Sequence, residues 1–300
     1  MTSLSTSAFY DRATIDMSAL RARAERLQGD IGRGERLSRS SDDPVAASRL
    51  RTLVRSDRIA QIDSFNANRA SADLGLTDRA LGSFAEYIIR AQELTTQAAS
   101  GTLTAAQRAG IGSELAQLHG NLVALANTRD GDGNALFGGE TAGAAYTVDA
   151  SGNPVYAGTA SAGELPLGDG QSVTRGLTGP EFLNFGGTDL FALVKGLADA
   201  LKGGVGDPAA AARGALDQLG QGLDSITTAQ TVIGSRMNWI NLTTNRAEAL
   251  GQQRSDEQAE VGGTDIAATV TRLQQAMTVL EASQASFARL SQLSLFDLLR

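Results

Sequence analysis

The side chains that most often carry catalysis or hold metals are scarce in this chain. The only histidine, His119, lies among Leu115, Leu118 and Leu122, and there is no cysteine. A Ser/His/Asp triad or a histidine-based metal site needs several such groups gathered at one place. We therefore expect no catalytic residue, no cofactor and no bound metal, and we predict that the protein is not an enzyme.

One short segment imitates a calcium-binding loop. Asp130, Asp132 and Asn134 have the spacing of the first three ligands of such a loop. The imitation then fails, because Ala135 occupies the place of the sharp-turn glycine and Thr141 that of the bidentate glutamate. The segment therefore predicts a tight turn rather than a metal site.

A pair of neighbouring carboxylates has a structural explanation. Asp42 and Asp43 come immediately before Pro44. Proline is tolerated in the first turn of a helix, where its missing N–H would have no partner, and acidic side chains complement the helix dipole there. Asp42, Asp43 and Pro44 are thus predicted to be a helix-start signature and not an acid/base pair.

The elements that position these residues are amphipathic helices, and the two ends of the chain show the same pattern. Apolar residues recur there at alternating steps of three and four, which is typical of the seam of a coiled coil. We predict that these stripes form an assembly interface, both within the chain and with neighbouring subunits. Its residues are Leu20, Leu27, Ile31, Ile266, Val270, Leu273, Met277, Leu280, Phe287 and Leu290.

Further helices are expected between the two ends. The pattern predicts one from Pro44 to about Ala99, a second from a capping box at Thr104 and Gln107 to about Asn127, and a third opened by Asp189. A long stripe then runs from Leu216 to Ala247, where we expect Trp239 to pack between helices. Glycine and turn residues mark residues 130–187 as a small β-rich insertion, with short strands near 145–148 and 155–157.

The predicted fold is mainly α with a small β-rich insertion. We expect an elongated rod of long antiparallel helices, with terminal coiled-coil arms and a β head. The predicted domains are an N-terminal arm (1–40), two halves of a helical rod (41–129 and 189–255), a variable β-rich domain (130–188) and a C-terminal arm (256–300).

Composition excludes several classes of partner. The net charge of −7 argues against nucleic acid, since phosphate neutralisation requires clustered Lys and Arg. Residues 1–60 are mildly basic, with eleven Arg against eight acidic residues, which we interpret as a solvated helix face. No apolar run approaches the length of a membrane span, and the first thirty residues lack the apolar core of a cleavable secretory signal.

Several motifs together resemble those of the bacterial flagellin superfamily. They are QGDIGRGERL at 28–37, SSDDPVAA at 40–47, NTRDGDGNALFGG at 127–139, VIGSR at 232–236 and LSLFDLLR at 293–300. The Asp-Asp-Pro version of the second motif resembles the hook-associated branch, because true flagellins usually have Asp-Asp-Ala-Ala-Gly there. The resemblance covers both helical thirds of the chain and says little about residues 140–188.

The resemblance implies a structural role in the bacterial flagellum. Members of this branch join the hook-associated protein 1 ring to the flagellin filament, and their termini pair in an inner coiled-coil tube. The implied partners are further copies of the chain, hook-associated protein 1, flagellin and a flagellar export chaperone, without membrane insertion. The implied location is extracellular, at the hook–filament junction, reached through the flagellar type III export apparatus without a cleavable signal peptide.

Two alternatives remain open at this stage. The first is a minor flagellin, because many flagellins also end in Leu-Leu-Arg. The second is a surface ligand-binding protein or adhesin that uses residues 130–187 for recognition. Its few candidate contact residues are aromatic, namely Tyr146, Tyr156, Phe182 and Phe185, and hydrophobic packing also explains them.

Overall fold

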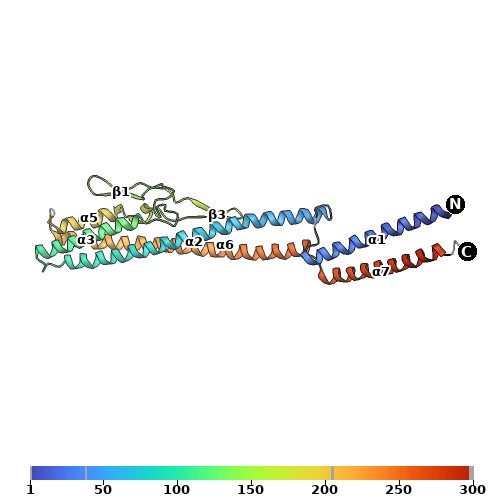
Figure 1. Ribbon diagram of the computed structural model, residues 1–300. Coiled ribbons are helices and arrows are strands. Elements are labelled where there is room, and N and C mark those ends of the chain that lie inside the picture. The colour runs from blue at the N-terminus through green and yellow to red at the C-terminus, as the bar shows by residue number, and fades with distance from the viewer. Residues whose placement is uncertain (1, 38, 204–205, 297–300) are drawn as a thin grey trace. The chain divides into compact units, whose positions relative to one another are not determined.

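The predicted mainly α fold with a small β-rich insertion is confirmed. The computed structural model describes residues 2–37, 39–203 and 206–296. The long helices in this part of the chain are α1 (Thr2–Arg33), α2 (Pro44–Ala98), α3 (Ala105–Ala126), α5 (Leu190–Leu201), α6 (Pro208–Gly262) and α7 (Ile266–Phe296) (Figure 1). Three short pairs of strands and the brief helix α4 (Gly179–Leu183) lie between α3 and α5.

The chain divides into two compact units. The first joins the described residues up to Arg58 to those from Leu250 onward, and the second runs from Ile59 to Ala249. The boundary between the units crosses both α2 and α6, so each of these helices contributes one segment to the first unit and another segment to the second.

In the first unit, α1 and α7 lie side by side (Figure 1). Backbone hydrogen bonds fix the segments that precede α2 and α7. The Arg36 N–H donates to the carbonyl of Gly262 over 2.9 Å, and the Thr264 N–H donates to that of Gly34 over 3.0 Å. Gly34 adopts a φ of 71°, a left-handed conformation that favours glycine.

The same unit holds the beginning of α2 against the end of α6. Asp57 accepts a hydrogen bond from the Arg254 Nε over 2.7 Å and a second from the Gln258 side chain. Arg49, which precedes Asp57 on α2, forms an ion pair with Glu257 of α6. These contacts define which faces of α2 and α6 meet in this unit.

In the second unit, α3 and α5 lie side by side (Figure 1). Helices α2 and α6 add apolar side chains to the same core. The predicted capping box is present, since the Gln107 N–H donates to Thr104 Oγ1 and the Thr104 N–H donates to Gln107 Oε1. Asp189 also caps its helix as predicted, by accepting a hydrogen bond from the Ala192 N–H over 2.8 Å.

The strands form three separate antiparallel pairs. These are β1 (Tyr146–Val148) with β2 (Pro154–Tyr156), β3 (Glu164–Gly168) with β4 (Gln171–Thr174), and β5 (Asn184–Phe185) with β6 (Thr188–Asp189). The first pair matches the two strands that the sequence predicts. A core triplet of aromatic rings links this region to α2: Phe137 and Phe182 lie with ring centroids 5.9 and 5.3 Å from that of Phe84.

Two details of the second unit differ from the sequence-based expectation. Helix α4 interrupts the β-rich region, and its start is fixed by Glu181, whose carboxylate accepts a hydrogen bond from the Thr178 N–H. The prediction that Trp239 packs between helices is wrong, because its side chain is 41% exposed. Its neighbour Ile240, one position further round the helix, takes the buried place instead.

Candidate assembly interface

The terminal helices meet along a thin seam. Near its outer end the ring of Tyr10 packs edge-on against that of Phe287, with centroids 5.4 Å apart. The Tyr10 hydroxyl donates a hydrogen bond to the carbonyl of Leu290 over 3.3 Å. The ring and the hydroxyl of Tyr10 thus both contact α7, and together they favour one alignment of α1 along α7.

Most residues of the predicted stripes lie half-buried in this seam. They are Leu20, Leu27 and Ile31 on α1, and Val270, Leu273, Leu280 and Phe287 on α7. Three predicted residues instead face outward, since Ile266 is 56%, Met277 is 49% and Leu290 is 46% exposed. The small side chain of Ala276 fills the seam position next to Met277 and is 7% exposed.

Apolar surface remains open along the same two helices. On α1, Phe9 is 53% and Ile15 is 65% exposed. An open groove of about 280 Å³ runs between the helices, lined by Thr14, Met17, Ser18, Arg21, Gln284 and Phe287. Both α1 and α7 therefore have exposed apolar side chains, which a further subunit could cover.

The helix-start signature has the predicted structural role. Helix α2 begins at Pro44, and the Asp43 carboxylate accepts a hydrogen bond from the Ala46 N–H over 3.0 Å. That N–H, together with the guanidinium of Arg36, holds the pKa of Asp43 below its ordinary value of 3.8. The Asp42 carboxylate accepts a hydrogen bond from the Arg39 N–H over 2.8 Å. Both acids thus organise the turn before α2.

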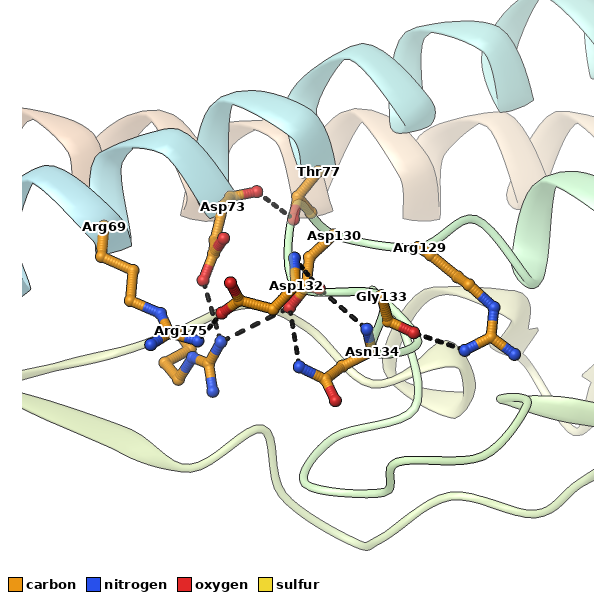
Figure 2. Close-up of polar contacts among 9 residues, drawn as sticks. All are labelled: Arg69, Asp73, Thr77, Arg129, Asp130, Asp132, Gly133, Asn134 and Arg175. Carbon is orange, nitrogen blue, oxygen red and sulfur yellow. Dashed lines mark hydrogen bonds and ion pairs between the residues drawn. The ribbon is translucent and has the colours of Figure 1, made fainter.

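The imitation of a calcium loop is a tight turn (Figure 2). Asp130 Oδ1 accepts hydrogen bonds from the backbone N–H groups of Asp132 and Asn134, over 2.9 and 2.8 Å. The Asp130 side chain is 7% exposed, and its carboxylate both accepts these turn hydrogen bonds and pairs with Arg175. Among the described residues, no group of three acidic or histidine side chains is placed to hold a metal ion.

Two arginines attach this turn to its surroundings (Figure 2). The Arg175 guanidinium lies 3.1 Å from Asp73 of α2 and 3.6 Å from Asp130, so it bridges the helix and the turn. Arg69 of α2 pairs with Asp132. A polar cavity of about 210 Å³ adjoins the bridge and includes Glu140 in its lining. This network could not be predicted from local sequence patterns, because Arg175 and Asp73 are 102 positions apart.

His119 has a structural setting. Its ring packs edge-on against Phe191, with centroids 6.1 Å apart, and its Nε2 has no hydrogen-bond partner in the described part of the chain. Burial, aided by the positive charge of Lys195, lowers the pKa of His119 below its ordinary value of 6.5. The imidazole therefore belongs to the packing of α3 against α5.

The aromatic residues that an adhesin would use are mostly inside the second unit. Tyr146 is 5% exposed and Phe182 is fully buried. Burial raises the pKa of the Tyr146 hydroxyl, whose ring packs against Phe191 with centroids 5.1 Å apart. These side chains attach the β-rich region to the helices.

No helix within residues 2–37, 39–203 and 206–296 combines the length and the apolar character needed to cross a membrane.

A comparison with family models matches residues 5–142 to the bacterial flagellin N-terminal helical region. The chain is also 28% identical over 291 residues to flagellar hook-associated protein 3 of Escherichia coli (strain K12). That alignment covers 88% of this chain and 89% of the relative.

The resemblance to the flagellin superfamily is confirmed. So is the resemblance to its hook-associated protein 3 branch, whose members are flagellar structural proteins. The fold agrees with two solved structures. One is a putative flagellar hook-associated protein from Vibrio parahaemolyticus, with a TM-score of 0.68, 23% identity, and coverage of 74% of this chain and 100% of the other. The second is FlgL of Xanthomonas campestris, with a TM-score of 0.61, 17% identity, and coverage of 69% and 99%.

Proposed function

We propose that this chain is a non-enzymatic subunit of the flagellum that joins the hook-associated protein 1 ring to the flagellin filament. The observation that carries the proposal is the alignment with hook-associated protein 3, which covers 88% of this chain and 89% of that protein. The open apolar surface of α1 and α7 supports a role in assembly. Such a subunit has further copies of itself, hook-associated protein 1 and flagellin as neighbours.

The mechanism is the burial of this surface between subunits. In a single chain the α1–α7 seam leaves Ile15, Ile266 and Met277 exposed. When several copies gather, these side chains leave water, and the hydrophobic effect then favours the assembled ring. The non-enzymatic part of the proposal rests on the roles of the candidate groups: His119 packs in a core, and Asp42, Asp43 and Asp130 cap backbone turns.

The proposed route to this location is the flagellar type III export apparatus, with an export chaperone as the partner before export. Mass spectrometry of the protein released into the medium tests the route. We expect the secreted chain to retain its N-terminal segment. A mass lowered by removal of an N-terminal segment would contradict export without a cleaved signal.

Location within the flagellum separates the proposal from a minor flagellin. Immunogold labelling should mark a thin ring at the base of the filament. A deletion strain should lack filaments and release unpolymerised flagellin, and expression of the intact chain should restore them. Labelling along the whole filament would instead identify a minor flagellin.

A further inference from the structure

The charges of the first unit are distributed unequally between its two central helix segments. Arg51, Arg55 and Arg58 are exposed on α2 at steps of four and three, so they lie on one helix face. Val54, which is 42% exposed, lies among them. Within the described residues, none of these three arginines forms an ion pair, in contrast to Arg49 on the face that meets α6.

The outer face of α6 in the same unit has the opposite charge. Asp256 and Glu260 are exposed and one helical turn apart. The charged side chains of α6 that reach α2 are different ones, Arg254 and Glu257. The acidic pair therefore lies away from the intramolecular contact.

The two charged faces cannot meet within one chain. With about 100° per residue, the centre of the three arginines lies roughly 150° around α2 from Arg49 and roughly 130° from Asp57, whose side chains contact α6. By the same arithmetic, the centre of Asp256 and Glu260 lies about 130° around α6 from the side that contacts α2 through Arg254, Glu257 and Gln258. A basic surface and an acidic surface thus lie on different sides of one helix pair.

We propose that the basic face Arg51, Arg55 and Arg58 of one copy docks on the acidic face Asp256 and Glu260 of a second copy. A contact between two basic faces would place like charges together, whereas the basic and acidic faces complement each other. Because one neighbour cannot cover both faces, each copy needs two neighbours. Such a heterologous contact closes into a ring or continues as a helical array.

This inference rests on the proposed function only in that both require self-association. It adds a polar, salt-sensitive contact to the apolar one made by α1 and α7. Screening shortens the reach of exposed charges from about 10 Å at 0.1 M salt to about 3 Å at 1 M. The docking contact is therefore expected to weaken with added salt, while burial of apolar surface does not.

Charge reversal in the full-length protein tests the contact. One variant combines Arg51→Glu, Arg55→Glu and Arg58→Glu, and the other combines Asp256→Arg and Glu260→Arg. All five side chains are exposed, so far-UV circular dichroism should show unchanged helix content. Sedimentation velocity at low salt should show that each variant alone loses self-association by about tenfold or more.

An equimolar mixture of the two variants is the decisive arm. One variant then has two acidic faces and the other two basic faces, so alternating copies should associate again. The control matched to the acidic-face variant reverses Asp78 and Glu86 to Arg, which makes the same change in net charge as that variant at exposed positions of α2 in the second unit. This control should associate as the unchanged protein does.

Crosslinking locates the contact independently. Because the chain has no cysteine, Arg55→Cys in one copy and Glu260→Cys in another introduce single reactive thiols. A short bismaleimide should join the two different variants to each other more efficiently than it joins either variant to itself. A Glu86→Cys chain should give only background crosslinking with Arg55→Cys.

Three results would overturn the docking contact: normal association of either charge-reversed variant, failure of the mixture to associate, or an unchanged protein that stays monomeric at low salt. None of these results would move the immunogold label. If any of these three results is obtained while the label lies at the filament base, this inference is rejected and the proposed function stands. Labelling elsewhere would reject the proposed function.

Discussion

At Gly112, helix α3 passes so close to α5 that a side chain has no room. A β-carbon added there would lie 2.8 Å from the carbonyl oxygen of Ala198 and 3.0 Å from the Lys202 side chain. The first neighbour is backbone and cannot rotate away. Glycine at this position therefore sets the separation of the two helices.

Replacement of Gly112 by alanine should lower the free energy of unfolding by about 1–3 kcal/mol, the usual cost of overpacking. Gly110 on the same helix provides the control, because nothing lies within 4 Å of its added β-carbon. Gly110→Ala should stabilise the protein by about 0.5–1 kcal/mol through helix propensity. Urea unfolding measures both changes. Equal stabilisation by the two substitutions would show that α3 and α5 are not in close contact.

His119 should make stability depend on pH in a window of its own. Its folded-state pKa lies below 6.5, so the unfolded chain takes up a proton first as the pH falls. Stability should therefore decline from pH 7.5 to pH 5. The carboxylates of Asp43 and Asp57 have lowered pKa values, and the stability that they contribute is lost only as the pH falls below 3.8.

Urea midpoints at several pH values test this assignment. In His119→Gln the decline between pH 7.5 and pH 5 should become shallower, while the loss below pH 3.8 should persist. An unchanged slope in the variant would mean that another group causes the decline.

At the scale of elements, the seam between α1 and α7 is the feature most open to disruption. Leu27 and Leu273 are half-buried in it. A chain with Leu27→Asp and Leu273→Asp places two like charges in the seam and must desolvate them when it assembles. We expect this variant to keep the second unit folded and to lose incorporation at the filament base.

Immunogold labelling of cells that express the variant gives the answer, and circular dichroism monitors the fold. The control is Ile89→Asp, which places one negative charge at an exposed apolar position of α2 in the second unit. It should still be incorporated. Normal incorporation of the double variant would remove the seam from the assembly mechanism.

The helices could be predicted from the sequence because their apolar periodicity and caps are local. The position of the α7 seam was predicted less accurately. The pattern selected Met277, whereas the structure places Ala276 in the seam. With about 100° per residue, Ala276 and Met277 lie roughly 50° to either side of the line through Leu273 and Leu280, so apolar spacing alone could not tell which of the two faces α1.

The β-rich region was predicted only in outline, for a physical reason. Its strands are short and are held by side chains from elsewhere in the chain. Pro166 of β3 accepts a hydrogen bond from Asn66 of α2, which lies 100 positions away, and Arg175 reaches Asp73. Local turn chemistry predicted the turn at Asp130 but could not predict these distant partners.

At the scale of the whole molecule, the two units differ in how well they are packed. The second has a core of fully buried side chains such as Phe84, Leu115 and Phe182. In the first, the described side chains of α1 are at best half-buried. Burial that is only partial offsets little of the conformational entropy lost when a helix is ordered.

We therefore expect residues 1 to about 40 and about 256 to 300 to be mobile in the soluble monomer and to become ordered on assembly. Limited proteolysis should trim both ends quickly and leave a stable central fragment, which mass spectrometry can delimit. Assembled protein should resist the same treatment. A verified monomer that resists cleavage at full length would show that its ends are already folded.

The first unit also has a consequence for the order of events during synthesis and export. It is built from both ends of the chain, and its two parts are joined by the backbone pairing of Glu35 with Gly263. The second unit is one continuous stretch. Whichever end of the chain emerges first, the continuous unit can fold before the last residues arrive, whereas the first unit must wait for them. The surface that binds neighbouring copies is therefore completed last, so a molecule cannot associate through it before its chain is complete.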